Sequence, residues 1–390
     1  MSFSKYHLTV VWPGYAFYNY HFFDELNKLS EKGYAINVIF IRGIREDSEF
    51  YNEHQLHENL NVVKCNFKGI RVKDYSILKN IKLFLLLFKY IVLSKKVLTS
   101  TQAPLHSKYA FVITKLLLKN IAVIVEQWED YKPSSSVMSY YKKLGYFLIK
   151  KADTVFVHGQ SQREFVTNHI GRKKRKTVVL PFLSRRPKSL ESESVNNNGI
   201  IILYFGRIIE QKGLDVLIEA FNQIETTKKA KLVICGGIDD NFFWNKSEAI
   251  TYYERCKQLA LYNENIVFTG QVDPKQKDDY FKKADVFVHP HKLFNNKNDG
   301  WGLVINEALS HGLPIITTPR VGSTSTLVHN QKNGFIVEPS NADALKEKIS
   351  ILIEDDTLRN KFSKAAKEMF EAYHKPEVIN EHLETYIVAK

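Results

Sequence analysis

The sequence has few of the residues that stabilise small secreted domains, and no long apolar segment. Its three cysteines, Cys65, Cys235 and Cys256, lie far apart and form no CxxC pair. This argues against a disulfide scaffold and a cysteine-based zinc site, and it favours a reducing compartment. The longest apolar run, Leu83–Leu93, is shorter than the ~20 residues of a membrane-spanning helix. It predicts a buried helix or, through its basic edges, a helix at a lipid interface. These edges carry Lys79, Lys82, Lys89, Lys95 and Lys96.

Glycine and proline are also scarce, with 18 Gly and 11 Pro in 390 residues, which excludes a low-complexity chain. The 44% hydrophobic and 25% charged residues are typical of globular proteins. At ~150 residues per domain, the length predicts two or three domains. Met1–Lys5 lead directly into a strand-like run without a signal-peptide pattern. We therefore expect a cytoplasmic protein, able to lie at the inner face of the cell membrane.

Positive charge is concentrated in the first half of the chain. Residues 1–182 contain 28 Lys and Arg against 14 Asp and Glu, a net charge of +14, whereas residues 183–390 carry −1. This asymmetry predicts an anionic partner for the first half: a membrane surface, a phosphate-bearing acceptor or nucleic acid. The densest basic cluster, Arg172–Lys176, fits a solvated loop and a docking patch equally well.

Short apolar runs alternate with amphipathic stretches almost from end to end. The expected strands are Tyr6–Trp12, Tyr34–Ile41, Asn61–Cys65, Val97–Thr101, Ile121–Glu126, Thr154–Val157, Thr177–Leu180, Ile200–Phe205, Lys231–Cys235, Ile266–Thr269, Val286–His289, Leu313–Thr317 and Phe335–Val337. The expected helices include Tyr18–Lys32, Tyr75–Lys95, Ser107–Leu118, Val137–Lys150, Gly213–Gln223 and Pro376–Val388. This pattern predicts an α/β protein with two Rossmann-like, doubly wound parallel-sheet domains facing a cleft.

The alternation is interrupted once, over the stretch from Phe182 to Gly199, which has no periodicity. We therefore expect an N-terminal domain over residues 1–182 and a linker over 183–199. The C-terminal domain would span residues 200–372, and a helix in 373–390 would cross back to the N-terminal domain. Ligands of such sheets bind at the carboxyl ends of the strands, so functional residues should follow the strands directly.

Three successive strands of the second half end in glycine, at Gly206, Gly236 and Gly270. Glycine allows close approach of the backbone to a ligand, so these strand ends predict room for one shared ligand. Arg207 and Lys212 follow the first of them and are suited to bind a diphosphate, although surface charge explains them equally simply.

Two carboxylates, Asp299 and Glu307, bracket a glycine-rich turn that opens a helix. The start of a helix suits an anion, and Glu307 is suited to accept hydrogen bonds from sugar hydroxyls. As a simpler interpretation, Asp299 is a charge at the start of the helix and Glu307 a solvated helix residue.

Taken together, these residues resemble the family 4 retaining glycosyltransferases (glycosyl transferases group 1). The resemblance rests on Gly206-Arg207-x4-Lys212-Gly213, on the spacing of Asp299 and Glu307, and on the run Glu307–Ile316. It covers residues 200–340 and implies the GT-B fold. The implied reaction moves a hexose-type sugar, with retention, from a UDP- or GDP-sugar to a saccharide acceptor, without metal or other cofactor. A lipid-linked acceptor in bacterial surface polysaccharide synthesis, such as lipopolysaccharide or capsule, is the expected context.

The resemblance also implies roles for single residues. Arg207 and Lys212 would bind the donor diphosphate, Glu307 the ribose and Asp299 the hydroxyls of the donor sugar. The backbone amides near Gly302 and Leu303 would face the phosphates. The remaining donor-binding residues would be Gly206, Gly236, Gly270, Gln271 and Val272.

The sequence departs from the family pattern in several places. Asp299 stands where Glu is usual, which predicts a different sugar preference or pose. Gly322–Thr326 lacks the acid common in that loop, and the loop at Gly14 lacks the usual glycine pair. Where a histidine often follows the strand near Glu126, this chain has acids, so Glu126 and Asp130 are candidates to orient the acceptor or donor sugar. His106 and His158 end strands of the first half and are further candidates on the acceptor side, although a structural role explains each of them more simply.

Other classes of protein fit parts of this pattern. A sugar-nucleotide epimerase or a phosphorylase would share the fold, and activity without an acceptor sugar would favour it. A nucleic-acid-binding protein would explain the basic half, but no RRM, KH, HTH or zinc pattern is present. The expected partners are therefore a nucleotide sugar, a saccharide or lipid-linked saccharide acceptor and an anionic membrane surface, with no nucleic acid and no metal.

Overall fold

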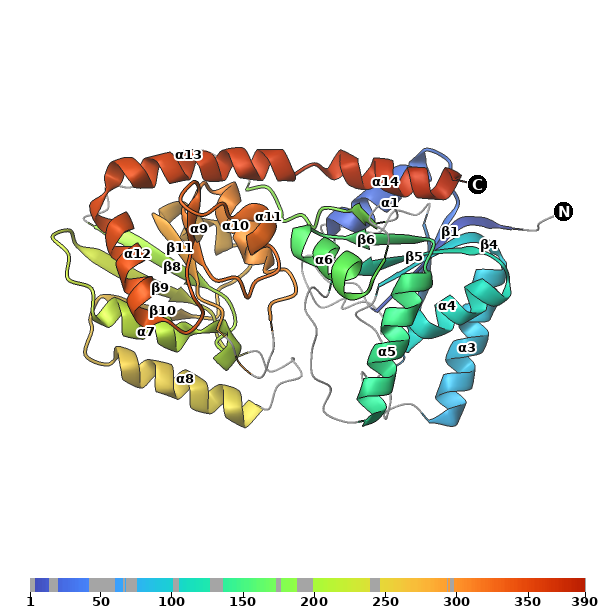
Figure 1. The fold of residues 1–390 in the computed structure, drawn as a ribbon, viewed down its shortest axis with the longest axis horizontal. Helices are drawn as coiled ribbons and strands as arrows, with labels where there is room; N and C mark the ends of the chain where they lie inside the picture. Colours follow the sequence, from blue (N-terminus) through green and yellow to red (C-terminus); the bar gives the residue numbers. More distant parts are fainter. Residues whose placement is uncertain are drawn as a thin grey trace. The chain divides into compact units, whose positions relative to one another are not determined.

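The chain forms two compact units, residues 1–183 with 375–390 and residues 184–374. The computed structural model describes residues 4–13, 20–41, 60–65, 67, 76–100, 105–126, 136–172, 177–187, 199–238, 246–292, 294 and 298–389. Each unit contains one parallel sheet flanked by helices, of seven strands in unit 1 and six in unit 2 (Figure 1). The expected α/β class with two parallel-sheet domains is therefore confirmed.

Unit 1 has the strand order β3-β2-β1-β4-β5-β6-β7. Its strands are β1 (Tyr6–Trp12), β2 (Ile36–Phe40), β3 (Asn61–Lys64), β4 (Ser94–Ser100), β5 (Asn120–Val125), β6 (Thr154–Val157) and β7 (Thr177–Val179). Its helices are α1 (Tyr20–Glu31), α3 (Ile77–Val92), α4 (His106–Leu116), α5 (Ser136–Lys151), α6 (Gln160–Glu164), a π-helical turn (Phe165–His169) and α14 (Pro376–Val388). The central strands are buried on both faces, which explains their continuous apolar sequence.

The two faces of this sheet are covered by different helices. Apolar residues of α3, α4, α5 and the π-helical turn pack in one core cluster against β1, β4, β5 and β6. On α14, the Asn380 side chain donates to the Glu25 carbonyl of α1 (3.3 Å), and the Tyr386 hydroxyl donates to the Val97 carbonyl of β4 (2.8 Å). The C-terminal helix is therefore part of the hydrogen-bonded structure of unit 1.

The expected helix Tyr75–Lys95 is too long at its C-terminal end. Helix α3 ends at Val92, and Ser94 already pairs with Tyr6 of β1. Lys96, expected at a basic edge, is buried in β4, and its ammonium donates to the Tyr386 carbonyl (2.5 Å). The helical pattern in the sequence continues past the end of α3, but the backbone there forms its hydrogen bonds with the sheet. The local pattern does not include this pairing.

Arg172, the first residue of the basic cluster, is also buried, and it belongs neither to a solvated loop nor to a docking patch. Its guanidinium donates to the carbonyls of Ile149 (2.9 Å), Ala152 (2.7 Å) and Asp153 (3.1 Å) around the end of α5. These carbonyls have no partner within the helix, so Arg172 caps it. The rest of the cluster, residues 173–176, lies outside the described residues.

Unit 2 has the strand order β10-β9-β8-β11-β12-β13. Its strands are β8 (Ile200–Phe205), β9 (Ala230–Cys235), β10 (Ile266–Gly270), β11 (Val286–His289), β12 (Ile315–Thr317) and β13 (Gly334–Ile336). Its helices are α7 (Leu214–Asn222), α8 (Lys246–Ala260), α9 (Lys277–Lys283), α10 (Leu303–Ser310), α11 (Thr324–Leu327), α12 (Ala342–Glu354) and α13 (Asp356–Tyr373). One 3-10 turn, Glu210–Lys212, precedes α7.

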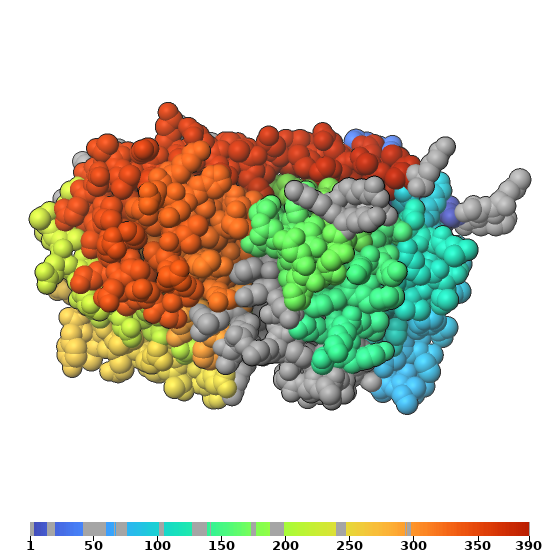
Figure 2. Space-filling view, in the orientation of Figure 1, coloured from blue at the N-terminus to red at the C-terminus, as the bar shows by residue number. Residues whose placement is uncertain are grey.

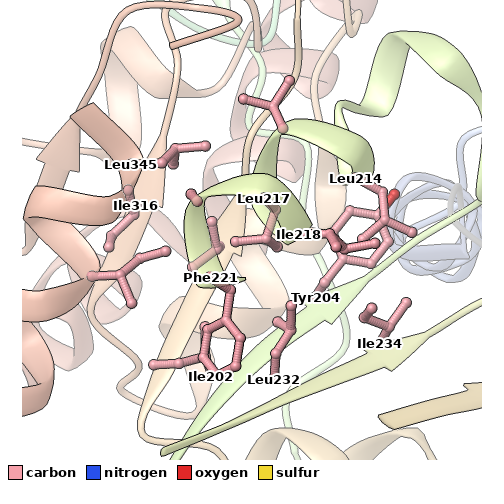
Figure 3. Packing of buried hydrophobic residues seen from close by; sticks show 14 of the residues in the cluster. Ile202, Tyr204, Leu214, Leu217, Ile218, Phe221, Leu232, Ile234, Ile316 and Leu345 are labelled. Carbon is pink, nitrogen blue, oxygen red and sulfur yellow. The ribbon is translucent and has the colours of Figure 1, made fainter. Parts of the chain in front are cut away.

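The core of unit 2 lies between the sheet and α7, α8 and α12. Leu217 and Phe221 of α7 are four residues apart and point toward Ile202 and Leu232 of the sheet (Figure 3). Burying a side chain of this size contributes about 1.5–3 kcal/mol. This packing fixes α7 against β8, and with it the loop that joins them.

Candidate functional site

The glycines at the strand ends of unit 2 lie side by side. The Gly206 amide donates to the Cys235 carbonyl, and the Gly236 amide donates to the Gly270 carbonyl, both at 2.9 Å. A Cβ on Gly236, whose φ is +150°, would lie 1.8 Å from the Gly206 carbonyl oxygen. A side chain is therefore excluded at Gly236, and the ends of β8, β9 and β10 form a narrow backbone shelf.

The loops after β8 and β11 meet at the point where the strand order reverses. From β8 the chain continues to β9 on one side, and from β11 it continues to β12 on the other. A Cβ on Gly213, at φ +69°, would lie 2.1 Å from the Pro290 carbonyl oxygen. The Lys292 ammonium donates to Asp215 at the start of α7 (2.7 Å). Such a switch point is the usual ligand site of an open parallel sheet, and here its two loops are held together.

Asp299 and Lys212 form an ion pair at this switch point, and His289 Nε2 lies 3.2 Å from Asp299 Oδ2. Burial would raise the pKa of Asp299, but the Lys212 ammonium and His289 outweigh it and hold that pKa well below its usual range. Burial and Lys212 lower the pKa of His289, so the imidazole is neutral and donates its Nε2 proton. Asp299 is therefore a fixed acceptor beside a fixed cation.

The loop that carries Asp299 is held by a neighbouring loop. The Asp299 amide donates to the Arg320 carbonyl and the Gly322 amide donates to the Asp299 carbonyl, both at 3.0 Å. Gly302, at φ +78°, has no room for a Cβ, which would lie 2.3 Å from Val321 Cγ1. Gly302 precedes α10, so the amides at the start of this helix are fixed next to Asp299.

Glu307, in the second turn of α10, is paired with a residue that sequence analysis did not identify. Lys277 Nζ, at the start of α9, lies 2.5 Å from Glu307 Oε1 and 4.9 Å from the centre of the Phe205 ring. Phe205 ends β8, so this pair lies beside the glycine shelf. Glu307 is not a solvated helix charge, because its side chain is only 17% exposed.

The other expected donor-binding residues follow the same strands. Arg207 comes directly after Gly206, and its carbonyl accepts a hydrogen bond from the Tyr204 hydroxyl (2.9 Å). Gln271 and Val272 follow β10, and Leu303 begins α10. All the residues assigned to the donor thus follow strands of one sheet, as the position of the motifs predicts, but their contacts with a donor stay predictions.

Unit 1 has a pocket at the carboxyl ends of β1, β5 and β6. Trp12 ends β1, Glu126 follows β5 and His158 follows β6, and all three line it together with His21 and Phe182. Burial raises the pKa of Glu126 to about 8, against a smaller lowering by the hydrogen bond with Ser100. Burial lowers the pKa of His158 to about 4. At neutral pH the pocket therefore presents a largely protonated carboxyl and a neutral imidazole.

The acceptor-side candidates are only partly brought together. Glu126 lines this pocket, whereas His106 begins α4, is buried and does not line it. Gly14 and Asp130 lie outside the described residues. His158 Nδ1 lies 3.0 Å from the Leu180 carbonyl oxygen. The sheet order makes β5 and β6 neighbours, so His158 and Glu126 line the same pocket although their spacing in the sequence does not predict it.

Among the described residues, no group of three or more His, Cys, Asp or Glu side chains is arranged to hold a metal ion. In the same residues, no helix has both the length and the apolar character needed to cross a bilayer.

Residues 185–369 match the family model "Glycosyl transferases group 1". The matched region covers nearly all of unit 2, which is just under half of the chain. The capsular polysaccharide biosynthesis glycosyltransferase CapM of Staphylococcus aureus is 28% identical over 247 residues, which cover 60% of each chain. The match therefore spans about three fifths of that relative.

Solved structures of similar fold cover nearly the whole chain. A glycosyltransferase from Rickettsia africae superposes with a TM-score of 0.73 at 18% identity, covering 99% of this chain and all of the other. HepE from Anabaena, in complex with UDP, superposes with a TM-score of 0.71 at 16% identity, covering 97% and 98%. The two parallel-sheet units thus have the arrangement of strands and helices of GT-B structures.

Proposed function

We propose that the protein is a retaining glycosyltransferase that moves a hexose-type sugar from a UDP- or GDP-sugar to a saccharide acceptor. The observation that carries the proposal is the glycine shelf of unit 2 beside the Lys212–Asp299 pair, at the switch point of a glycosyl transferases group 1 domain. A shelf without side chains suits the flat base and ribose of a nucleotide, and the adjacent cation suits its phosphates.

The proposed donor site assigns one task to each group. An ammonium has three N–H donors, so Lys212 can bind a phosphate oxygen while it holds Asp299. Arg207 adds a planar guanidinium at the end of β8, and the first amides of α10 add the positive end of a helix dipole. Glu307 accepts hydrogen bonds from the ribose diol, with Lys277 holding its carboxylate in place.

Transfer requires that the charge on the departing diphosphate be stabilised. Cleavage of the anomeric C–O bond leaves that charge on the nucleotide, and Arg207, Lys212 and the α10 amides supply the positive groups nearby. We propose that these groups suffice without a metal ion, so activity should persist in EDTA. Retention would follow from attack on the same face as the departing phosphate, and NMR of the product's anomeric proton tests it.

We further propose a lipid-linked saccharide acceptor in bacterial surface polysaccharide synthesis, on the inner face of the cell membrane. Support comes from the capsular function in the name of the Staphylococcus aureus relative and from the basic first half of the chain. The pocket that Glu126 and His158 line in unit 1 is the candidate acceptor contact. There the protonated carboxyl can donate a hydrogen bond to a sugar oxygen. The neutral imidazole, whose Nδ1 proton goes to the Leu180 carbonyl, can accept one from a sugar hydroxyl at Nε2.

Thermal unfolding with UDP, GDP, ADP and CMP tests the donor site. A nucleotide at a hundredfold excess over its Kd stabilises the folded state by about 2.7 kcal/mol. We expect stabilisation by one nucleotide, much less of it in Glu307→Ala, and no such loss in Glu347→Ala, whose exposed carboxylate lies on α12. Stabilisation by none of the four would reject the proposal. Turnover of a sugar nucleotide without acceptor would favour an epimerase instead.

A further inference from the structure

Three helices of unit 1 expose many large apolar side chains. On α3, the exposed residues range from 40% (Val92) to 79% (Ile77). The turn after α4 contains Leu118, which is 94% exposed, and α5 contributes Phe147 at 53%. The full set is Ile77, Leu78, Ile81, Leu85, Phe88, Val92, Val112, Leu116, Leu118, Tyr140 and Phe147. We call the outward side of these three helices the α3–α5 face.

These residues point away from the same face of the sheet. The inward sides of α3, α4 and α5 belong to one core cluster, through Leu87, Phe111 and Leu148 respectively. Helices α3 and α4 also touch directly, since the Tyr109 hydroxyl donates to Asn80 Oδ1 (3.2 Å). Because all three helices cover one side of the sheet, their outward sides form a common surface, and Figure 2 shows parts of α3 and α5 on the exterior.

Helix α3 is apolar on both of its sides. Leu83, Leu87 and Ile91 recur every four residues and are fully buried, whereas Ile81 and Leu85 recur on the exposed side. A surface helix normally turns polar and charged residues outward, whereas α3 also turns large apolar residues outward, beside its exposed lysines. The inner side of α3 packs into the core of unit 1. Its outer side has no apolar neighbour that buries it among the described residues.

The charges on the α3–α5 face have one sign. None of the three helices contains Asp or Glu. Six lysines in them are exposed: Lys79, Lys82, Lys89, Lys143, Lys150 and Lys151. A second copy of this chain on the same face would bring these lysines together, and a neutral protein partner would leave them without counter-charges. The combination of exposed leucines and lysines suits a surface that is both apolar and anionic.

We propose that the α3–α5 face binds the surface of an anionic lipid bilayer. The apolar side chains enter the boundary between headgroups and acyl chains, and the lysines pair with lipid phosphates. The inference deepens the proposed function, on which it rests only for the membrane location, since it names the surface that contacts the membrane. This surface differs from the Arg172 cluster, whose first residue is used inside unit 1.

Flotation with two kinds of vesicle tests the proposal. One kind contains equal parts of phosphatidylcholine and phosphatidylglycerol, and the other phosphatidylcholine alone. The wild-type protein should bind the anionic vesicles at least tenfold more tightly. Ile81→Ser/Leu85→Ser and Lys82→Glu/Lys89→Glu should each weaken that binding about tenfold or more, since one lysine at an anionic surface alone accounts for about fivefold.

The controls place the same changes on unit 2. Leu261→Ser/Tyr262→Ser removes exposed apolar groups, and Lys361→Glu/Lys364→Glu reverses exposed charges on α13. Both should bind vesicles as the wild type does. Far-UV circular dichroism and thermal unfolding show that each variant is folded.

Three results would overturn the proposal. They are wild-type protein that does not float with anionic vesicles, α3–α5 variants that bind like the controls, and a wild-type dimer that Ile81→Ser/Leu85→Ser converts to monomers. Nucleotide stabilisation is measured without vesicles, and flotation without nucleotide. If only the nucleotide stabilisation is absent, the donor site is rejected. If only the flotation with anionic vesicles is absent, the membrane surface is rejected.

Discussion

Replacing Lys212 by methionine should destabilise unit 2 by about 3 kcal/mol. Removing one partner of a buried ion pair typically costs about 3–5 kcal/mol, because the other charge is left uncompensated. The low end applies here, because the Asp299 side chain keeps 19% exposure and a hydrogen bond from His289. For a domain of this size, about 3 kcal/mol corresponds to a fall of ~6–12 °C in Tm.

Calorimetry of three variants separates the lost pair from the lost side chain. Asp299→Asn alone leaves the Lys212 ammonium without its carboxylate and should also be less stable. In Lys212→Met/Asp299→Asn no charge remains unpaired, so much of the stability should return. The double-mutant cycle formed by these variants and the wild type then gives the interaction energy between Lys212 and Asp299.

The pH dependence of Lys212→Met provides a second check. Burial and Lys212 both lower the pKa of His289 in the wild type. Without Lys212 that pKa rises, and a protonated His289 can take over as the cation beside Asp299. Since a raised folded-state pKa stabilises at low pH and is lost as pH rises through it, the deficit of Lys212→Met should be smaller at pH 5.5 than at pH 8.

The reasoning would be refuted by a Lys212→Met protein that melts within about 2 °C of the wild type. A deficit of the expected size that the double variant does not reduce would show that the aliphatic stem of Lys212, not its charge, stabilises the loop. A deficit that is equal at both pH values would exclude His289 as the substitute cation.

Two further changes test unit 1. Burial raises the folded-state pKa of Glu126 to about 8, so its contribution to stability should fall between pH 5 and 8, because the unfolded state ionises first. In urea unfolding, the stability of Glu126→Gln relative to the wild type should therefore rise over that range. A difference in unfolding free energy that stays constant with pH would contradict this. Arg172→Ala leaves the carbonyls around the end of α5 without their donor and should lower the free energy of unfolding by about 2–3 kcal/mol. The matched control Arg163→Ala, on α6, should lower it by less.

Local periodicity carries most of the information about the elements of this fold. Strands such as Ile200–Phe205 and Val286–His289, and the helix Pro376–Val388, have the bounds that their apolar patterns predict. The glycine endings could be identified because a strand's carboxyl end and a ligand-binding edge coincide in parallel sheets. The expected helix to Lys95 failed where sheet pairing, a long-range interaction, overrides the local pattern.

By itself, the sequence determined two parallel-sheet units and the strand ends at which the candidate site lies. Only the tertiary structure decided which residues meet there. Lys277 and Glu307 are thirty positions apart, and no spacing predicts their ion pair, because strand order and helix packing bring α9 and α10 together. The same holds for the basic residues of unit 1. Packing buries Arg172 and leaves the outer side of α3 exposed, because periodicity defines the faces of a helix but not what covers each one.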